Sequence, residues 1–180
     1  MHLHKDSLAL LVVDIQDGLV PHIHLGEHVI ATASKLCTVA RQLNIPILVT
    51  EQAPAKLGTT NETVRDAAGD APTLDKVTFS CMGDQGIRHH LNDLKCRQII
   101  LCGMETHICV ALTARDLLEE GYEVAICSDG VSSRNVQKHE VALKTLRTQG
   151  AWVMPFETLA YDLMEQAGTP DFKALLHLFK

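Results

Sequence analysis

Residues 98–121 read QIILCGMETHICVALTARDLLEEG. The apolar run of this stretch continues without alternation up to Gly103, which favours a strand that is buried on both faces. Apolar residues at helical spacing follow over residues 106–120, and Gly121 is the residue type that commonly ends a helix. The stretch therefore predicts a buried strand, a tight turn and a helix, which together form the repeating unit of a parallel sheet.

The same alternation of apolar runs and helical patterns extends over the rest of the chain. The predicted strands cover residues 8–13, 45–50, 74–79, 98–102, 123–127 and 151–154. The predicted helices cover residues 27–43, 84–94, 106–120 and 138–149, with shorter helical pieces after residue 158. This order predicts the α/β class: a three-layer α/β/α sandwich with a mainly parallel, Rossmann-like sheet of about six strands. We expect one domain over residues 1–180, with residues 52–72 as a long, irregular functional loop.

The composition is that of an ordinary globular chain. Its 180 residues are 46% hydrophobic and carry a net charge of -6, so we expect no nucleic-acid partner. The apolar run at residues 8–13 is too short to span a membrane and lacks the pattern of a signal peptide, so we expect no membrane partner. Six irregularly spaced cysteines indicate free thiols in a reducing compartment. We expect a cytoplasmic protein, with an organelle as the open alternative.

Three polar residues stand at the ends of predicted strands. Asp14 follows LALLVV, Lys76 interrupts LDKVTF, and Cys109 follows QIILC after the turn GMETHI. Because ligands of open α/β sheets bind at the carboxyl ends of the strands, we expect these side chains to lie close together. A thiolate is a nucleophile, an ammonium lowers the pKa of a thiol, and a carboxylate can carry its proton. The ordinary alternatives are a helix cap for the aspartate, a surface position for the lysine and a core position for the cysteine.

Other chemistries match the motifs poorly. His107 and Cys109 do not form a zinc-ligand set with Cys102, because helix positions two apart do not face one another and Cys102 lies within the strand. The spacing of Cys102 and Cys109 is unlike that of a CxxC redox pair. The sequence has no GxGxxG after a strand and no GxxxxGK[ST]. We therefore predict no metal and no cofactor.

Several segments together resemble the isochorismatase-like, or cysteine hydrolase, family, and within it the compact YcaC-like and isochorismatase-domain-containing branch. The segments cover nearly the whole chain: LLVVDIQDGL (10–19), PILVTEQAPAKLGTT (46–60), LDKVTFSCMG (74–83), QIILCGMETHICVALTARDLLEEGYEVAICSDGVSSR (98–134) and AWVMPFETLAYDL (151–163). The strand–GxxxxxCV–helix segment is the most specific of them, and the order Asp, Lys, Cys adds to it.

The resemblance implies a hydrolase with a catalytic triad of Asp14, Lys76 and Cys109. It also implies a non-proline cis peptide between Met104 and Glu105, and an oxyanion hole formed by the backbone amides of Glu105 and Cys109. Cys109 would attack the carbonyl carbon of a small amide-type substrate and form a covalent acyl intermediate. The family is commonly oligomeric, so the resemblance implies a homo-oligomer. The alternative function is that of a catalytically silent oligomeric or partner-binding protein that retains the fold.

Five further residues are candidates for the walls of a substrate pocket: Gln16, Leu19, His24, Phe79 and Thr106. They flank the triad residues in the sequence, and ordinary packing is the alternative for each of them.

The sequence departs from better-defined branches of the family in two places. Metal-dependent relatives carry a D-x-H motif and a further histidine after the second strand, where this chain has Thr50-Glu51-Gln52. Glu51 and Gln52 either support the site or anchor the fold. Glu105 adds a charge that the chemistry does not require, so we expect its carboxylate to point away from Cys109 or to pair with a base. For Arg134 we expect a structural or interface pairing rather than a substrate contact.

Overall fold

A computed structural model describes residues 2–180 and contains one six-stranded sheet in the order β3-β2-β1-β4-β5-β6. The strands are β1 (Leu8–Val13), β2 (Ile47–Gln52), β3 (Thr73–Lys76), β4 (Gln98–Met104), β5 (Glu123–Ser132) and β6 (Trp152–Met154). All neighbouring pairs run parallel. This is the Rossmann strand order, in which the direction of winding reverses between β1 and β4. The predicted α/β class is confirmed.

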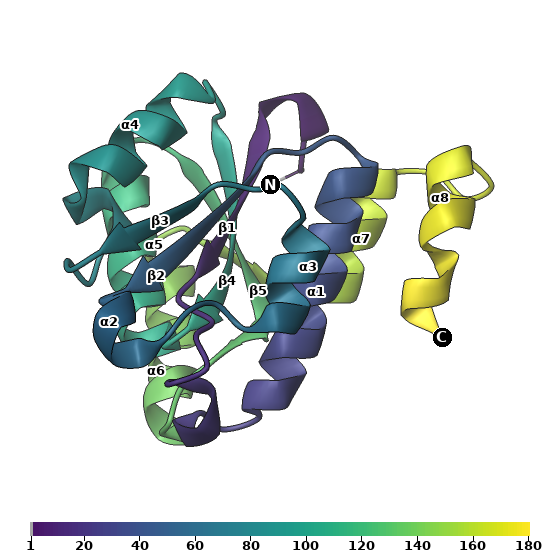
Figure 1. Ribbon diagram of the computed structural model, residues 1–180. Coiled ribbons are helices and arrows are strands. Elements are labelled where there is room, and N and C mark those ends of the chain that lie inside the picture. Colours follow the sequence, from purple (N-terminus) through teal and green to yellow (C-terminus); the bar gives the residue numbers. More distant parts are fainter. Residues whose placement is uncertain (1) are drawn as a thin grey trace.

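Helices cover both faces of the sheet (Figure 1). One face carries α1 (Gly26–Gln42), α3 (Glu62–Ala68) and α7 (Phe156–Met164), and the other carries α4 (Gln85–Asp93), α5 (Ala111–Glu119) and α6 (Val136–Thr148). The last helix, α8 (Pro170–Leu175), lies outside this sandwich, beyond α1 and α7. No helix within residues 2–180 combines the length and the apolar character needed to cross a membrane.

The two helical layers explain why the strands are apolar without alternation. Successive residues of a strand point to opposite faces of the sheet. In β1, Leu8, Leu10 and Val12 join the apolar core under α1 and α7. Ala9 and Leu11, together with the last residue of the strand, join the core under α4 and α5. Because both faces are covered, every position of β1 is buried.

The strand ends differ from their predicted positions for local reasons. β3 ends at Lys76 instead of residue 79, and the carbonyl oxygens of Thr78 and Phe79 lie 3.3 and 3.4 Å from the Lys76 ammonium. β2 begins two residues later than predicted, after Pro46, which has no N–H to donate to a neighbouring strand. β5 continues past residue 127, where a shift of register allows it to resume pairing with β4.

The expectation of an irregular loop over residues 52–72 is wrong. This segment contains α2 (Pro54–Leu57) as well as α3, and the Asn61 side chain caps α3 by accepting the Thr63 N–H at 3.1 Å. The predicted helix over residues 106–120 also has a different beginning, because Thr106–Val110 forms a wider π-helical turn before α5.

Gly103 allows β4 to run closely beside β1. Its φ is +129°, and a Cβ added there would overlap the carbonyl oxygen of Val13 in the neighbouring strand. Only glycine fits such a position without moving the main chain. The glycine therefore allows the end of β4 to lie next to the end of β1, which Asp14 directly follows.

Replacing this glycine should strongly destabilise the fold. We expect Gly103→Ala to lower the free energy of unfolding by more than about 3 kcal/mol, because the overlap with the backbone of β1 adds to the conformational strain. Gly121→Ala is the matched control: its φ is +85° and nothing lies within 4 Å of the added Cβ. Strain alone should cost the control about 1–2 kcal/mol. Urea denaturation measures both, and equal losses would contradict the role given to the contact with β1.

Candidate active site

The candidate site lies where the winding of the sheet reverses. Asp14 is the first residue after β1, and its φ of +53° turns the chain out of the sheet. Aspartate adopts this left-handed conformation more readily than most residues with a side chain. Cys109 lies in the π-helical turn after β4, the next strand in the sheet. Lys76 is the last residue of β3, two strands away on the other side of β1.

A buried ion pair forms the centre of the site. The Lys76 ammonium donates to Asp14 Oδ2 at 2.6 Å, and neither side chain is exposed. The ammonium also donates to Gln52 Oε1 at 2.7 Å, which is its closest uncharged partner. Burial by itself would lower the pKa of Lys76, but the negative charge of the Asp14 carboxylate reverses this effect and raises the pKa above its ordinary value. Lys76 is therefore charged at neutral pH.

The Asp14 carboxylate accepts hydrogen bonds from two side chains and lies near a thiol. Oδ2 accepts from Lys76, and Oδ1 accepts from the Thr50 hydroxyl at 2.8 Å. The thiol of Cys109 lies near the same carboxylate, whose negative charge contributes to the raised pKa of the thiol. A second thiol, that of Cys81, lies 3.8 Å from the Thr50 hydroxyl and is completely buried. The three predicted residues thus converge around one carboxylate.

The Cys109 thiol keeps its proton in the resting site. Burial raises the pKa of Cys109 to about 12, with the Asp14 carboxylate as the next cause. The Lys76 ammonium lowers this pKa, as the sequence analysis predicts, but it does not offset the other two effects. The structure therefore places a neutral thiol beside a carboxylate that can take its proton, rather than a preformed thiolate.

The turn between β4 and the helix directs the Glu105 side chain away from Cys109. The Met104–Glu105 peptide bond is cis in the structure. The Glu105 carboxylate accepts the backbone N–H of Arg134 at 2.9 Å and lies 3.5 Å from the Arg134 guanidinium. Glu105 is not among the groups that shift the pKa of the Cys109 thiol. The carboxylate thus pairs with a base, and Arg134 has a structural partner.

Two candidate pocket residues make hydrogen bonds inside the protein. The Gln16 side chain donates to the carbonyl oxygens of Gln52 and Gly58 at 3.1 and 2.6 Å, and it accepts the Gln52 N–H at 2.8 Å. The Thr106 hydroxyl lies 2.9 Å from His139 Nδ1. Gln16 therefore ties β2 to the chain after β1, and Thr106 ties the turn to α6.

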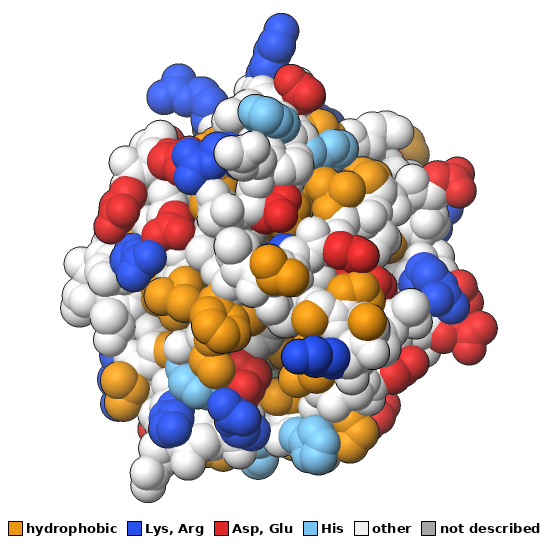
Figure 2. All heavy atoms as spheres, turned by 60° about the vertical axis from the view of Figure 1, so that its left-hand side comes forward, with side chains coloured by type: hydrophobic (Ala, Val, Ile, Leu, Met, Phe, Trp, Pro, Cys, Tyr) orange, Lys and Arg blue, Asp and Glu red, His pale blue; other side chains and the backbone are white. Residues whose placement is uncertain are grey.

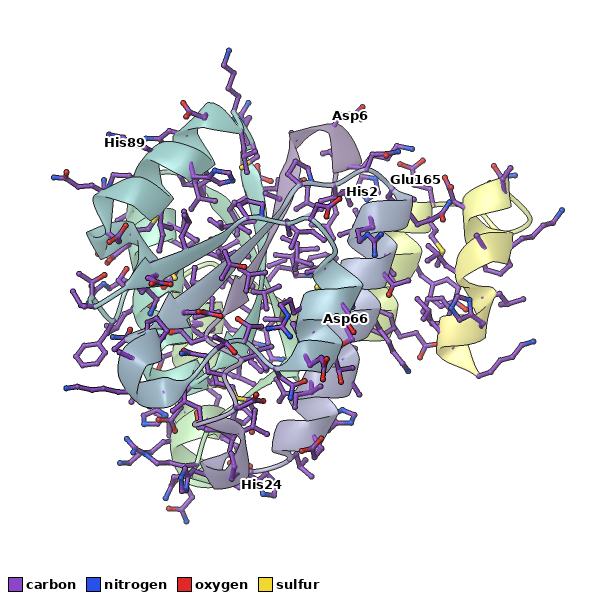
Figure 3. All side chains as sticks on the ribbon, viewed as in Figure 1. His2, Asp6, His24, Asp66, His89 and Glu165 are labelled. Atoms are coloured by element: carbon purple, nitrogen blue, oxygen red, sulfur yellow. The ribbon has the colours of Figure 1, made fainter. Side chains whose placement is uncertain are left out.

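The other three candidate pocket residues lie nearer the surface. Leu19 is half-buried and packs against the core on the α1 side. His24 is exposed at the end of the molecule where α1 begins (Figure 3). Phe79 is 60% exposed, and its backbone carbonyl contacts the Lys76 ammonium. A pocket role for these three side chains stays a prediction.

Two residues of this region, Cys81 and Thr113, were not predicted from the sequence: Cys81 lies near the ion pair, and Thr113 holds Cys81. The Cys81 backbone N–H donates to the Thr113 hydroxyl at 2.9 Å, which fixes the short helix Cys81–Gly83 against α5. The only sequence signal was the place of Cys81 five residues after Lys76. A cysteine or threonine in an apolar helix has no distinguishing pattern, so the fold was needed to find them.

A largely apolar hollow in the surface lies apart from these residues. It is a groove of about 490 Å³ between α5 and α6, lined by Leu112, Val141 and Leu146 among others. His107 reaches its rim, but Asp14, Lys76 and Cys109 do not line it. Within residues 2–180, no cluster of three or more His, Cys, Asp or Glu side chains is arranged to hold a metal ion.

Comparison with known proteins identifies the family. Residues 8–158 match the model of the Isochorismatase domain, so the chain belongs to the isochorismatase family. It is 38% identical over 170 residues to isochorismatase domain-containing protein 2 of Danio rerio, covering 94% of this chain and 85% of that protein. It is 35% identical over 184 residues to the secreted isochorismatase effector Isc1 of Phytophthora sojae, covering 97% and 85%. The solved structure of the MAR1 ribonuclease from Caenorhabditis elegans superposes with a TM-score of 0.93 at 34% identity, covering 99% of this chain and 92% of that one.

The buried pair should couple strongly in a double-mutant cycle. We expect Lys76→Met and Asp14→Asn each to lower the free energy of unfolding by about 3–5 kcal/mol, because each leaves one charge buried without its partner. Asn tolerates the left-handed backbone at position 14. The double variant should lose clearly less than the sum, because it leaves no buried charge. Urea denaturation at pH 7 measures all four proteins, and additive losses would contradict the buried pair.

Proposed function

We propose that this member of the isochorismatase family is a cysteine hydrolase of a small amide-type substrate. The observation that carries the proposal is the single carboxylate of Asp14, which binds the Lys76 ammonium and lies near the Cys109 thiol. A nucleophile, a proton carrier and a fixed positive charge are the groups that acyl transfer through a covalent intermediate requires.

In the first half of the reaction, Cys109 Sγ attacks the carbonyl carbon of the substrate and a C–S bond forms. The thiol proton passes to the nearby carboxylate of Asp14. Because the pKa of the resting thiol is raised to about 12, proton transfer to Asp14 accompanies the attack rather than preceding it. Asp14 then gives the proton to the leaving nitrogen, the C–N bond breaks, and a thioester to Cys109 remains.

In the second half, a water molecule attacks the thioester carbonyl and transfers a proton to Asp14. The C–S bond breaks, the carboxylic acid product leaves, and Cys109 recovers its proton from Asp14. The Lys76 ammonium stabilises the negative charge on either Asp14 or sulfur throughout the cycle. The backbone N–H groups of Glu105 and Cys109 would hold the oxyanion of each tetrahedral intermediate. Since only 7% of Cys109 is exposed, we infer that the acyl group that reaches it is small.

The alternative is a catalytically silent oligomeric or partner-binding protein. Two observations would also be expected of this alternative: the nearly complete burial of Cys109 and the raised pKa of its thiol. The C. elegans relative is by its name a ribonuclease. For the present chain, the net charge of -6 does not favour binding to RNA.

We also propose that the chain acts as a homo-oligomer. Val77 and Phe79 are 80% and 60% exposed immediately after Lys76, and large apolar side chains beside a site are typical of a surface that a partner covers. Figure 2, which brings the α4 and β3 side of the molecule forward, shows apolar side chains gathered among charged ones. The cytoplasmic location stays a prediction, and the P. sojae relative is by its name a secreted protein.

A screen for hydrolysis of small amides tests the proposed function. We expect at least one amide to be hydrolysed, with turnover reduced by a factor of at least about 10³ in Cys109→Ala, because the covalent route is lost. Cys96→Ala is the matched control, because Cys96 is half-buried just before the amino end of β4, while the site lies at the carboxyl ends of the strands, and this variant should retain full activity. Hydrolysis that persists in Cys109→Ala would overturn the nucleophile. A complete absence of turnover in the wild type would favour the silent alternative.

A further inference from the structure

Three polar residues, Thr50, Glu51 and Gln52, follow one another at the carboxyl end of β2, and their side chains point to opposite faces of the sheet in turn. Glu51 points to one face, where its carboxylate accepts the backbone N–H and the hydroxyl of Thr60 at 2.6 and 2.8 Å. Thr50 and Gln52 alternate with it and point to the other face. Thr50 donates to Asp14, and Gln52 accepts from Lys76. Both charged members of the buried pair are therefore contacted from one strand.

The Gln52 amide can face Lys76 in only one orientation. Its Oε1 accepts from the Lys76 ammonium at 2.7 Å, and its Nε2 donates to the carbonyl oxygen of Val77 at 3.0 Å. A flipped amide would place its NH₂ against the ammonium and its oxygen against the carbonyl. The backbone of Gln52 is fixed as well, because the Gln16 side chain bonds both its N–H and its C=O.

The groups that accept hydrogen bonds from the Lys76 ammonium differ in charge. Lys76 has two close acceptors, Asp14 and Gln52, and two longer contacts to backbone carbonyls. Of the close acceptors, Asp14 carries a charge and Gln52 does not. The neutral amide satisfies the ammonium without competing for its charge, which remains directed toward Asp14 and Cys109.

We propose that Gln52 is a positioning residue of the site: its amide fixes the Lys76 ammonium against Asp14 and, by being neutral, leaves the lysine charge to stabilise the thiolate of Cys109. This inference rests on the proposed function, in which Cys109 is the nucleophile. It assigns to Gln52 a role that a purely structural anchor of β2 would not have, because the role depends on the charge of the side chain and not only on its shape.

The rate at which iodoacetamide alkylates Cys109 provides the test. The modified peptide is followed by mass spectrometry between neutral and strongly alkaline pH in the wild type and in Gln52→Glu, Gln52→Met and Gln149→Glu. The titratable groups that face the thiol are Asp14, Lys76 and Cys81. The rise of the alkylation rate at alkaline pH, called the alkaline limb below, therefore reports the titration of Cys109 coupled to these groups. Gln149→Glu adds the same charge at an exposed position after α6 and controls for net charge.

In Gln52→Glu the alkaline limb should move to higher pH, with alkylation at a fixed pH about tenfold slower, because the second carboxylate competes for Lys76. In Gln52→Met the ammonium loses one acceptor, and the rate should fall about threefold, the equivalent of one weak hydrogen bond. Gln149→Glu should follow the wild type. The methionine variant keeps the test valid if a carboxylate beside the Val77 carbonyl prevents folding.

Profiles of both Gln52 variants that coincide with that of Gln149→Glu would overturn the role of Gln52 while leaving Cys109 as the nucleophile. A wild-type Cys109 that stays unmodified at every pH at which the protein is folded would instead contradict the proposed function. The two failures are therefore distinguishable.

Discussion

The structure depends on one buried ion pair, that between Asp14 and Lys76. Neither side chain is exposed, and removing two charges from water carries a penalty that a pair of apolar side chains would not incur. The pair is retained with additional hydrogen bonds from Thr50 to the carboxylate and from the ammonium to Gln52. A buried ion pair stabilises a core less than apolar side chains of similar size would. It does hold a carboxylate and a positive charge beside the Cys109 thiol, as a catalytic site requires.

The order of the strands brings the members of this site together. β1 lies between β2 and β4, so the chain after β1 is in reach of the turn after β4 on one side and of β2 and β3 on the other. Gly103 permits the close approach of β4, and the left-handed conformation of Asp14 turns its side chain out of the strand. The long side chain of Lys76 spans the remaining distance from β3 across the end of β2. The site is therefore a consequence of the topology together with a few special backbone positions.

Most of the fold could be predicted from the sequence, because strands buried on both faces leave continuous apolar runs and helices end at glycines such as Gly121. The convergence of Asp14, Lys76 and Cys109 was predictable from their places at strand ends. The hydrogen bonds of Thr50 and Gln52 were not, because a threonine and a glutamine at the end of a strand have many ordinary roles. The direction in which the pKa of Cys109 shifts was also out of reach, since it depends on burial outweighing the nearby ammonium. The helices within residues 52–72 were missed because they are too short to show a helical repeat of apolar residues.

If Cys109 carries the acyl group, the covalent intermediate can be trapped. The protein is mixed with a panel of small amides and their activated esters, quenched with acid after short times, and mapped by peptide mass spectrometry. We expect an acyl adduct on Cys109 that appears before the free acid is released and that is absent from Cys109→Ala. An adduct on another residue, or release of the acid from Cys109→Ala at the wild-type rate, would contradict this expectation.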